Sequence, residues 1–163
     1  MATFKEIYKE DQYRDDSAIP NLIRYISRHD HAISRYIGAV GVDLEHAADQ
    51  MIWTSKHFNK NSGKRLRHFV LAFDGNHSED LVTIFSIGER IAEKIAKRYQ
   101  VAFAIHENTE NLHIHFVLNA VSYIDGKRYR GTHEEYKDIL KKCNKAVSNA
   151  GLGCVMPVKK ERT

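Results

Sequence analysis

Three histidines stand close together in the stretch HENTENLHIHFVLN, residues 106–119. Its second half has the apolar character of a buried strand, in which successive side chains point to opposite faces. His113 and His115 therefore project from the same face, about 7 Å apart along the strand. Two imidazoles in that arrangement can converge on one metal ion, whereas a single histidine on a strand is more often a core or surface residue. The alternate positions are expected to face the core: Ile114, Phe116 and Leu118.

A hairpin can bring a third histidine to this pair. His106 follows the apolar run 100–105, and only six residues separate that run from the strand that begins at Leu112. Because a parallel crossover needs a dozen or more residues, the short link predicts an antiparallel pair with His106 beside His113. Three imidazoles on one face make a facial metal site with open coordination positions.

The elements around the histidines predict an α+β fold. Helix-period patterns span 17–28, 43–58, 78–99 and 132–151, and strand patterns span 2–8, 36–42, 66–73, 100–105, 112–123 and 127–130. The last two strands are expected to form a hairpin through the turn residues Asp125 and Gly126. No linker-like segment interrupts the chain, so we expect one domain over residues 1–163, with a central, mainly antiparallel sheet flanked by helices.

Composition limits the classes of protein. The chain is 42% hydrophobic and 28% charged, as in an ordinary globular protein, and its net charge of +4 favours a polyanionic partner such as nucleic acid. Two cysteines make neither a disulfide framework nor a set of zinc ligands, which favours a reducing compartment. No apolar stretch has the length of a signal peptide core or a membrane span. We therefore expect a cytoplasmic protein without membrane insertion.

The histidine motif resembles the signature of conjugative relaxases, the plasmid mobilisation nucleases of the HUH endonuclease superfamily. Three further segments resemble that family in the same order along the chain. RYISR (24–28) is similar to its nucleophile motif, RHFVLAF (67–73) to its second strand, and NAVSYIDGKRYR (119–130) to the strand and hairpin that follow the metal motif. Together these segments span roughly residues 20 to 130.

The resemblance implies a fold, a reaction and a set of site residues. The fold is an HUH endonuclease-like sandwich. The reaction nicks one DNA strand at an origin of transfer through a covalent 5′-phosphotyrosine, and can rejoin it. Tyr25 would be the nucleophile, and the metal ligands would be His106, His113 and His115, with Glu110, Asn111 and Asn119 around them. Mn²⁺ or Mg²⁺ suits the phosphate chemistry, although three imidazoles would also hold Zn²⁺ or Ni²⁺. The implied partners are single-stranded DNA and accessory or coupling proteins of conjugation.

Basic residues indicate where DNA would lie. Arg24 and Arg28 flank Tyr25 and could hold a phosphate. Two further groups could follow a single-stranded backbone, with Tyr123 or Tyr129 stacking on a base, although such runs are usually solvated faces. These groups are Lys64, Arg65 and Arg67, and Lys127, Arg128 and Arg130.

Other assignments stay open. Tyr36 is the second candidate nucleophile, and His29 or His31 would serve if the nucleophile were a histidine. His68 is expected to be structural, and only Glu107 and Glu110 suggest themselves as acidic residues that orient a ligand histidine.

Three other functions compete with a relaxase. A rolling-circle replication initiator or single-tyrosine transposase would place the nucleophile after the histidine motif, at Tyr136. A tri-histidine metal hydrolase would use activated water and form no adduct, and a non-catalytic DNA-binding protein would have no use for three ligand histidines. A histidine-triad nucleotide hydrolase is disfavoured because Val117 stands where the third alternating histidine would be.

Overall fold

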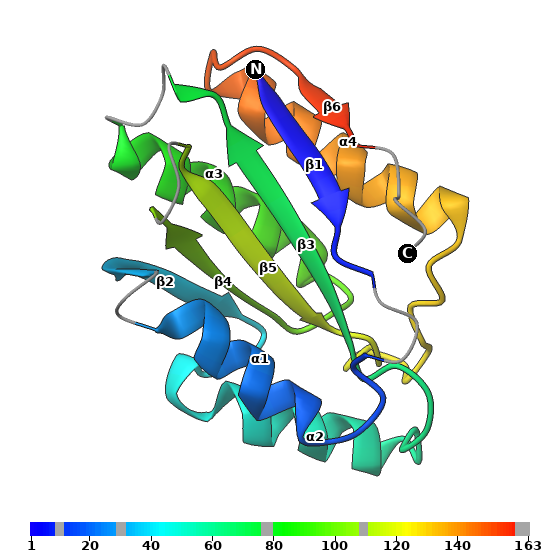
Figure 1. The fold of residues 1–163 in the computed structure, drawn as a ribbon. Coiled ribbons are helices and arrows are strands. Elements are labelled where there is room, and N and C mark those ends of the chain that lie inside the picture. Colours follow the sequence, from blue (N-terminus) through cyan, green and yellow to red (C-terminus); the bar gives the residue numbers. More distant parts are fainter. Residues whose placement is uncertain (9–11, 29–31, 76–79, 108–110, 159–163) are drawn as a thin grey trace.

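A computed structural model describes residues 1–8, 12–28, 32–75, 80–107 and 111–158. These residues form a six-stranded sheet in the order β2-β4-β5-β3-β1-β6 (Figure 1). Every neighbouring pair is antiparallel except β1 and β6, which run parallel. The strands are β1 Ala2–Glu6, β2 Ala32–Val40, β3 Leu66–Phe73, β4 Val101–His106, β5 His113–Asn119 and β6 Val155–Pro157.

Helices cover both faces of the sheet. One face packs against α3 (Leu81–Ile95) and α4 (His133–Asn149), and the other against α1 (Ala18–Ser27) and α2 (Ala47–His57), which follows a 3₁₀ turn at Leu44–His46 (Figure 1). The predicted α+β fold with a mainly antiparallel sheet between helices is thereby confirmed.

Each face has its own hydrophobic core. The larger core lies under α3 and α4 and contains Ile114, Phe116 and Leu118, as predicted for the alternate positions of β5. The smaller core lies under α1 and α2 and contains Val117. Because His113 and His115 share a face with Val117, both histidines project toward the α1 side of the sheet.

Phe103 shows how closely the larger core is packed. Its ring lies between Gly38 of β2 and Gly88 of α3. A β-carbon at Gly38 would lie 2.5 Å from Cζ of this ring, and one at Gly88 would lie 3.2 Å from Cδ2. The two glycines therefore provide the space that the aromatic ring fills.

Several predicted boundaries differ from the structure. The strand predicted over 127–130 is wrong, because beyond β5 the pairing is reduced to a single bridge between Val121 and Arg128. The helix predicted over 78–99 ends at Ile95, whose carbonyl accepts hydrogen bonds from the N–H groups of both Arg98 and Tyr99 in a tight turn. Strand β2 begins at Ala32, earlier than expected, and β6 was not predicted. Among the described helices, none is long and apolar enough to cross a membrane.

Candidate metal centre

The predicted hairpin brings three histidines together at one end of β4 and β5. His106 is paired directly with His113 in the antiparallel register. One ring nitrogen from each of His106, His113 and His115 lies within 4.8 Å of the corresponding nitrogens of the other two. The rings of His106 and His115 are the closest, with centroids 4.1 Å apart. The prediction that His106 joins the strand pair is therefore confirmed, and we call these three residues the histidine cluster.

Hydrogen bonds on the outer side of the cluster set which ring nitrogen faces inward. His106 donates its Nε2–H to the carbonyl oxygen of Ile26, at 2.7 Å. His113 donates its Nδ1–H to the carbonyl oxygen of Asn111, at 3.1 Å. In a neutral imidazole the other nitrogen then carries the lone pair, so His106 presents Nδ1 and His113 presents Nε2. Outer hydrogen bonds of this kind are what fix ligand histidines in metal sites.

His115 is oriented by another histidine. Its Nδ1 lies 2.7 Å from Nε2 of His68 on β3, and Nδ1 of His68 lies 3.3 Å from the hydroxyl oxygen of Tyr13. Burial, with the charges of His106 and Lys5, lowers the pKa of His68 to about 4. His68 is therefore neutral near pH 7, and with its proton on Nδ1 it can accept the Nδ1–H of His115. The cluster nitrogen of His115 is then Nε2.

The sequence pattern does not reveal this role of His68. A single histidine on a strand is typical of a structural residue, and the candidates for an orienting group in the sequence are acidic side chains. Tyr13 does not belong to any sequence motif either. In the structure its φ of 66° is positive, which is unusual for a bulky residue. Burial raises the pKa of Tyr13, and so does the charge of Tyr25.

Tyr25 lies against the histidine cluster. The centroid of its ring lies 6.0 Å from those of both His106 and His115, with the ring planes steeply inclined. The residue is 41% exposed, so the ring meets both the cluster and the solvent. Helix α1 positions it because Ile19, Leu22 and Ile26 are buried in the smaller core while Tyr25 stays on the rim.

The two other candidate tyrosines lie elsewhere. The ring of Tyr36 packs at a tilt against that of Phe85 on α3, and the ring of Tyr136 packs at a tilt against that of Phe4, both against the larger core. Both rings are thus packed on the side of the sheet opposite the histidine cluster. Of these three tyrosines, Tyr25 is the one beside the cluster.

Of the residues predicted to surround the metal ligands, one lies beside the histidine cluster and another lies far from it. Asn111 adjoins His113 and contacts it through the backbone carbonyl. Asn119 lies at the far end of β5, where its amide donates to the carbonyl of Met51 and to the side chain of Gln100, so the structure does not bring it to the cluster. Glu110, His29 and His31 lie outside the described residues.

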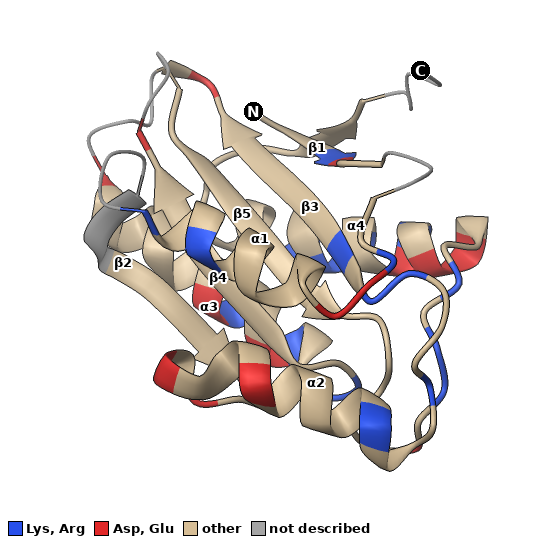
Figure 2. Ribbon diagram, turned by 60° about the horizontal axis from the view of Figure 1, so that its bottom comes forward, with Lys and Arg blue, Asp and Glu red and all other residues tan. Residues whose placement is uncertain are grey.

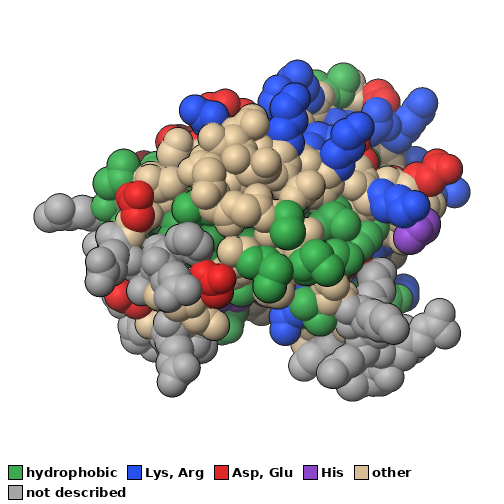
Figure 3. Space-filling model, turned by 90° about the horizontal axis from the view of Figure 1, so that it is seen from above, with side chains coloured by type: hydrophobic (Ala, Val, Ile, Leu, Met, Phe, Trp, Pro, Cys, Tyr) green, Lys and Arg blue, Asp and Glu red, His purple; other side chains and the backbone are tan. Residues whose placement is uncertain are grey.

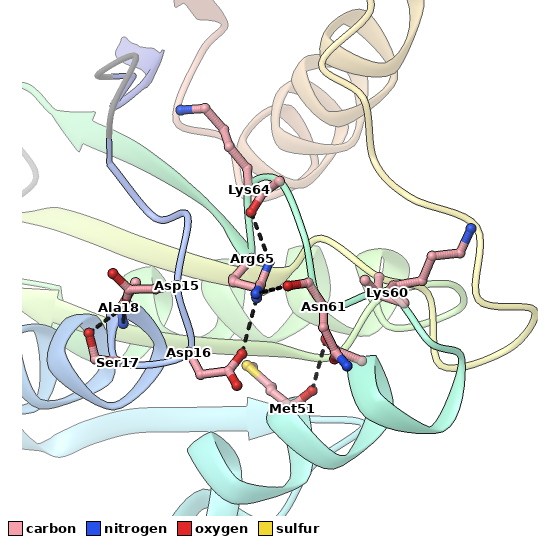
Figure 4. Close-up of polar contacts among 12 residues, drawn as sticks. Asp15, Asp16, Ser17, Ala18, Met51, Lys60, Asn61, Lys64 and Arg65 are labelled. Carbon is pink, nitrogen blue, oxygen red and sulfur yellow. Dashed lines mark hydrogen bonds and ion pairs between the residues drawn. The ribbon is translucent and has the colours of Figure 1, made fainter.

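Two of the predicted DNA-contacting arginines are engaged inside the protein. Arg65 pairs with Asp16 at 3.0 Å and donates to the carbonyls of Asn61 and Gly63, which ties the loop after α2 to the start of α1 (Figure 4). Arg67 pairs with buried Glu6 at 3.1 Å. In Figure 4 the ammonium group of Lys64 points away from the Arg65 contacts. It lies 3.9 Å from the ring centroid of Tyr8.

Most of the remaining predicted contacts are exposed. Arg24 and Arg28 are exposed at the end of α1, and Lys127 and Arg130 are exposed beyond β5. Arg128 is half-buried and donates to the carbonyls of Lys60 and Lys64. DNA contact by these residues stays a prediction.

Comparisons with known proteins agree with this architecture. The chain belongs to the relaxase family described as MobA/VirD2-like, nuclease domain, whose model matches residues 25–152. The resemblance to relaxases of the HUH type is thereby confirmed. The matched segment includes Tyr25 and the whole histidine cluster.

Three proteins of Staphylococcus aureus, each named Protein rlx, are similar to this chain. One is 38% identical over 102 residues, which cover 63% of this chain and 31% of the relative. Another is 27% identical over 101 residues, covering 62% of this chain and 30% of the relative. The third is 30% identical over 98 residues, covering 53% and 31%. The matches thus span less than a third of each relative's length.

Proposed function

We propose that this chain nicks one strand of DNA at an origin of transfer, with Tyr25 as the nucleophile and the histidine cluster as the site of a divalent metal ion. The observation that carries the proposal is the contact of the Tyr25 ring with both His106 and His115. A phosphate held at the cluster would lie beside the Tyr25 phenol. Family membership supports DNA as the substrate.

The donor set fits a divalent metal ion. Three imidazole nitrogens lie within 4.8 Å of one another, and the hydrogen bond on the other side of each ring leaves a lone pair directed inward. Neutral ligands leave the charge of the ion uncompensated, so that, when bound, it would polarise the scissile phosphate and offset developing negative charge. Mn²⁺ or Mg²⁺ suits that role, and Zn²⁺ or Ni²⁺ would also bind imidazoles.

Tyr25 supplies the covalent chemistry. Its phenolic oxygen attacks phosphorus, so that the Tyr25 Oη–P bond forms while the bond from phosphorus to the 3′ oxygen breaks. The phenolic proton passes to solvent, and the departing 3′ oxygen takes up a proton to become a hydroxyl. The products are a 5′-phosphotyrosine and a free 3′-hydroxyl. Because the phosphotyrosine keeps an ester bond, attack by a 3′-hydroxyl reverses the reaction and rejoins the strand.

Arg24 and Arg28 are proposed to hold the neighbouring phosphates. They are exposed on the last turn and at the end of the helix that carries Tyr25. We also propose that the nicking reaction takes place in the cytoplasm, with accessory or coupling proteins of conjugation as partners. Asn111 is proposed to assist by holding His113 through its backbone.

The test is adduct formation on labelled single-stranded DNA. Oligonucleotides tiling both strands of the genetic element that encodes the protein would be incubated with Mn²⁺, and denaturing gels would reveal covalent protein–DNA complexes. We expect an adduct that mass spectrometry maps to Tyr25, that EDTA abolishes, and that Tyr25→Phe lacks. Tyr36→Phe and Tyr136→Phe serve as matched controls and should keep it.

Each competing function predicts another outcome. Cleavage without an adduct would indicate a hydrolase that uses water, and the tyrosine assignment would be wrong. Loss of the adduct in Tyr136→Phe would indicate a nucleophile on α4, as in a replication initiator. Binding without cleavage by any oligonucleotide would favour a non-catalytic DNA-binding protein.

A further inference from the structure

A cavity of about 1000 Å³ lies at the opposite end of the sheet from the histidine cluster. It is bounded by the end of α3, the segment 127–130 and the first turns of α4. Tyr129, on its wall, donates its backbone N–H to the carbonyl of Ala120, directly after β5. Since β5 rises about 3.3 Å per residue, the cavity is about 20 Å from the cluster. It is therefore separate from the proposed catalytic site.

The wall of this cavity is strongly basic. Among the described residues it carries eight lysines or arginines and three acidic side chains. Two of the three carboxylates are engaged: Glu135 accepts from the backbone at Arg130 and Thr132, and Asp138 pairs with Lys142. The exposed lysines in the wall include Lys94, Lys97 and Lys127. In Figure 2, basic positions also follow the loops that join this end of the sheet to α2 and α4.

The arginines at this end repel one another. Burial lowers the pKa of Arg128, and so do the charges of Arg65, Arg67 and Arg130. An anion in the cavity would relieve this repulsion. Tyr129 also lines the cavity, and its buried hydroxyl has no hydrogen-bond partner among the residues the structure describes.

An aromatic hollow lies beside the basic cavity. It measures about 300 Å³ and is lined by Trp53, His57, Phe58 and Tyr123. The turn 122–127 separates the two hollows, because Arg98 of the basic cavity pairs with Asp125 while Phe58 of the aromatic hollow packs against Gly126. Trp53 is 65% exposed although its ring stacks on His57 at 4.9 Å. A large exposed indole is a surface on which a nucleic-acid base can stack.

One buried lysine has contacts toward both this end and the proposed catalytic site. The carbonyl of Lys64 accepts a hydrogen bond from Arg128, and the ammonium group of Lys64 lies 5.9 Å from the ring centroid of Tyr13. Tyr13 contacts His68 behind the histidine cluster. Lys64 therefore stands between the basic cavity and the proposed catalytic site.

We infer that this end of the molecule is a second nucleic-acid site, in which the basic cavity binds backbone phosphates of single-stranded DNA and Trp53 stacks on an unpaired base. The inference rests on the proposed function for the identity of the nucleic acid. At 3.4 Å per nucleotide of a B-form strand, 20 Å corresponds to about six nucleotides. This site would thus hold the substrate at a distance from the scissile phosphate.

Intrinsic fluorescence gives a direct test, because Trp53 is the only tryptophan in the chain. Tyr25→Phe protein would be titrated with the oligonucleotide (dT)30 in EDTA, so that binding is measured without nicking. We expect saturable quenching of the Trp53 emission. Fluorescence anisotropy of labelled (dT)30 should show that Trp53→Ala weakens binding roughly fivefold or more.

Charge variants test the cavity. The triple variant Lys94→Gln, Lys97→Gln, Lys127→Gln should weaken (dT)30 binding at least about tenfold and reduce the slope of log K against log salt by about 2. The matched control removes the same charge from lysines that do not line the cavity: Lys137→Gln, Lys141→Gln, Lys145→Gln. The control should leave binding within about twofold.

Each contrary result has a distinct meaning. If the two triple variants lost the same affinity for (dT)30, the loss would reflect net charge alone, and the assignment of the cavity would be wrong. Saturated binding without any change in Trp53 emission would overturn the stacking assignment, and equal affinity for a duplex of the same length would overturn the single-strand preference. Nicking by the wild type with normal binding by the cavity variant would refute this inference alone. Trp53 quenching in a protein that never nicks would refute the proposed function alone.

Discussion

The Nε2 atom of His68 lies 2.7 Å from the Nδ1 atom of His115, so one member of the histidine cluster is oriented by a residue of the neighbouring strand. The two residues are diagonal neighbours across β3 and β5, since His68 is paired with Val117. His68 is buried and continues through its other nitrogen to Tyr13. When His68 accepts this hydrogen bond, the proton on His115 is on the side away from the cluster.

Replacing His68 should weaken metal binding according to the hydrogen bond that the substitute can make. In His68→Gln an amide oxygen can take the place of Nε2 as acceptor, whereas His68→Met has similar length and no comparable acceptor. We expect His68→Met to lower the affinity for Mn²⁺ by roughly 10- to 100-fold and His68→Gln to lose much less. Isothermal titration calorimetry measures both. Equal losses would mean that His68 contributes packing alone.

Metal binding should stabilise the folded chain. An ion that binds the folded state alone adds about 2.7 kcal/mol at a concentration 100 times its dissociation constant. For a domain of this size that raises Tm by roughly 5–10 °C. Calorimetry with Mn²⁺ and then with excess EDTA should show the rise and its reversal. His113→Ala removes one ligand with little loss of core, and should abolish the rise. A persistent rise would place the ion elsewhere.

Gly38→Ala should destabilise the protein by about 1–3 kcal/mol, because the added methyl group would overlap the ring of Phe103. Urea unfolding monitored by circular dichroism measures this change. The double variant Gly38→Ala, Phe103→Leu should show less loss than the sum of the two single variants, since the smaller side chain vacates the space. Strict additivity would show that the two residues do not share it.

Arg67 should contribute to stability whatever its part in binding DNA. Its guanidinium and the carboxylate of Glu6 are both almost fully buried. Arg67→Met would remove the cation that pairs with this buried carboxylate, at a cost of about 3–5 kcal/mol. The double variant Glu6→Gln, Arg67→Met should recover much of that loss in urea unfolding. A fully stable Arg67→Met protein would show that the pair is unimportant for folding.

The two cysteines should differ in reactivity. Cys154 is exposed and Cys143 is buried on α4, where burial raises the pKa of its thiol. Because the thiolate is the reactive form, Ellman's reagent should titrate one thiol per folded chain at any pH between 7 and 9. Two thiols should react in guanidinium. A second thiol titrating in the native protein as the pH rises within this range would contradict the burial of Cys143.

Local patterns explain why so much of the sheet is predictable from the sequence. The run 66–73 is bounded by polar loops and matches β3 from end to end. The short link after β4 permits only an antiparallel partner, which is why its length alone places His106 opposite His113. Strand β6 has three residues and pairs with β1 from the other end of the chain, so it has no local signal.

The features that the sequence does not predict depend on long-range register. His68 orients His115 only because β3 lies next to β5. The local sequence around either histidine does not predict that the two strands pair. Asn119 resembles a residue of the metal motif. It lies six residues beyond His113 on β5, however, and therefore contacts α2 and Gln100 instead of the cluster. The sequence around Trp53 does not indicate a binding site, because only the folded structure shows that this exposed helix residue lines the aromatic hollow.

The face seen from above the view of Figure 1 is mixed, with hydrophobic side chains at its centre and Lys and Arg along one border (Figure 3). The two faces of the sheet differ in what they carry. One side has the larger core and neither the histidine cluster nor Tyr25, while the other combines the smaller core with both. We therefore expect local opening of α1 to disturb the proposed catalytic site while α3 and α4 stay packed on the other face of the sheet. Amide protons of α1 should exchange through smaller openings than those of α3.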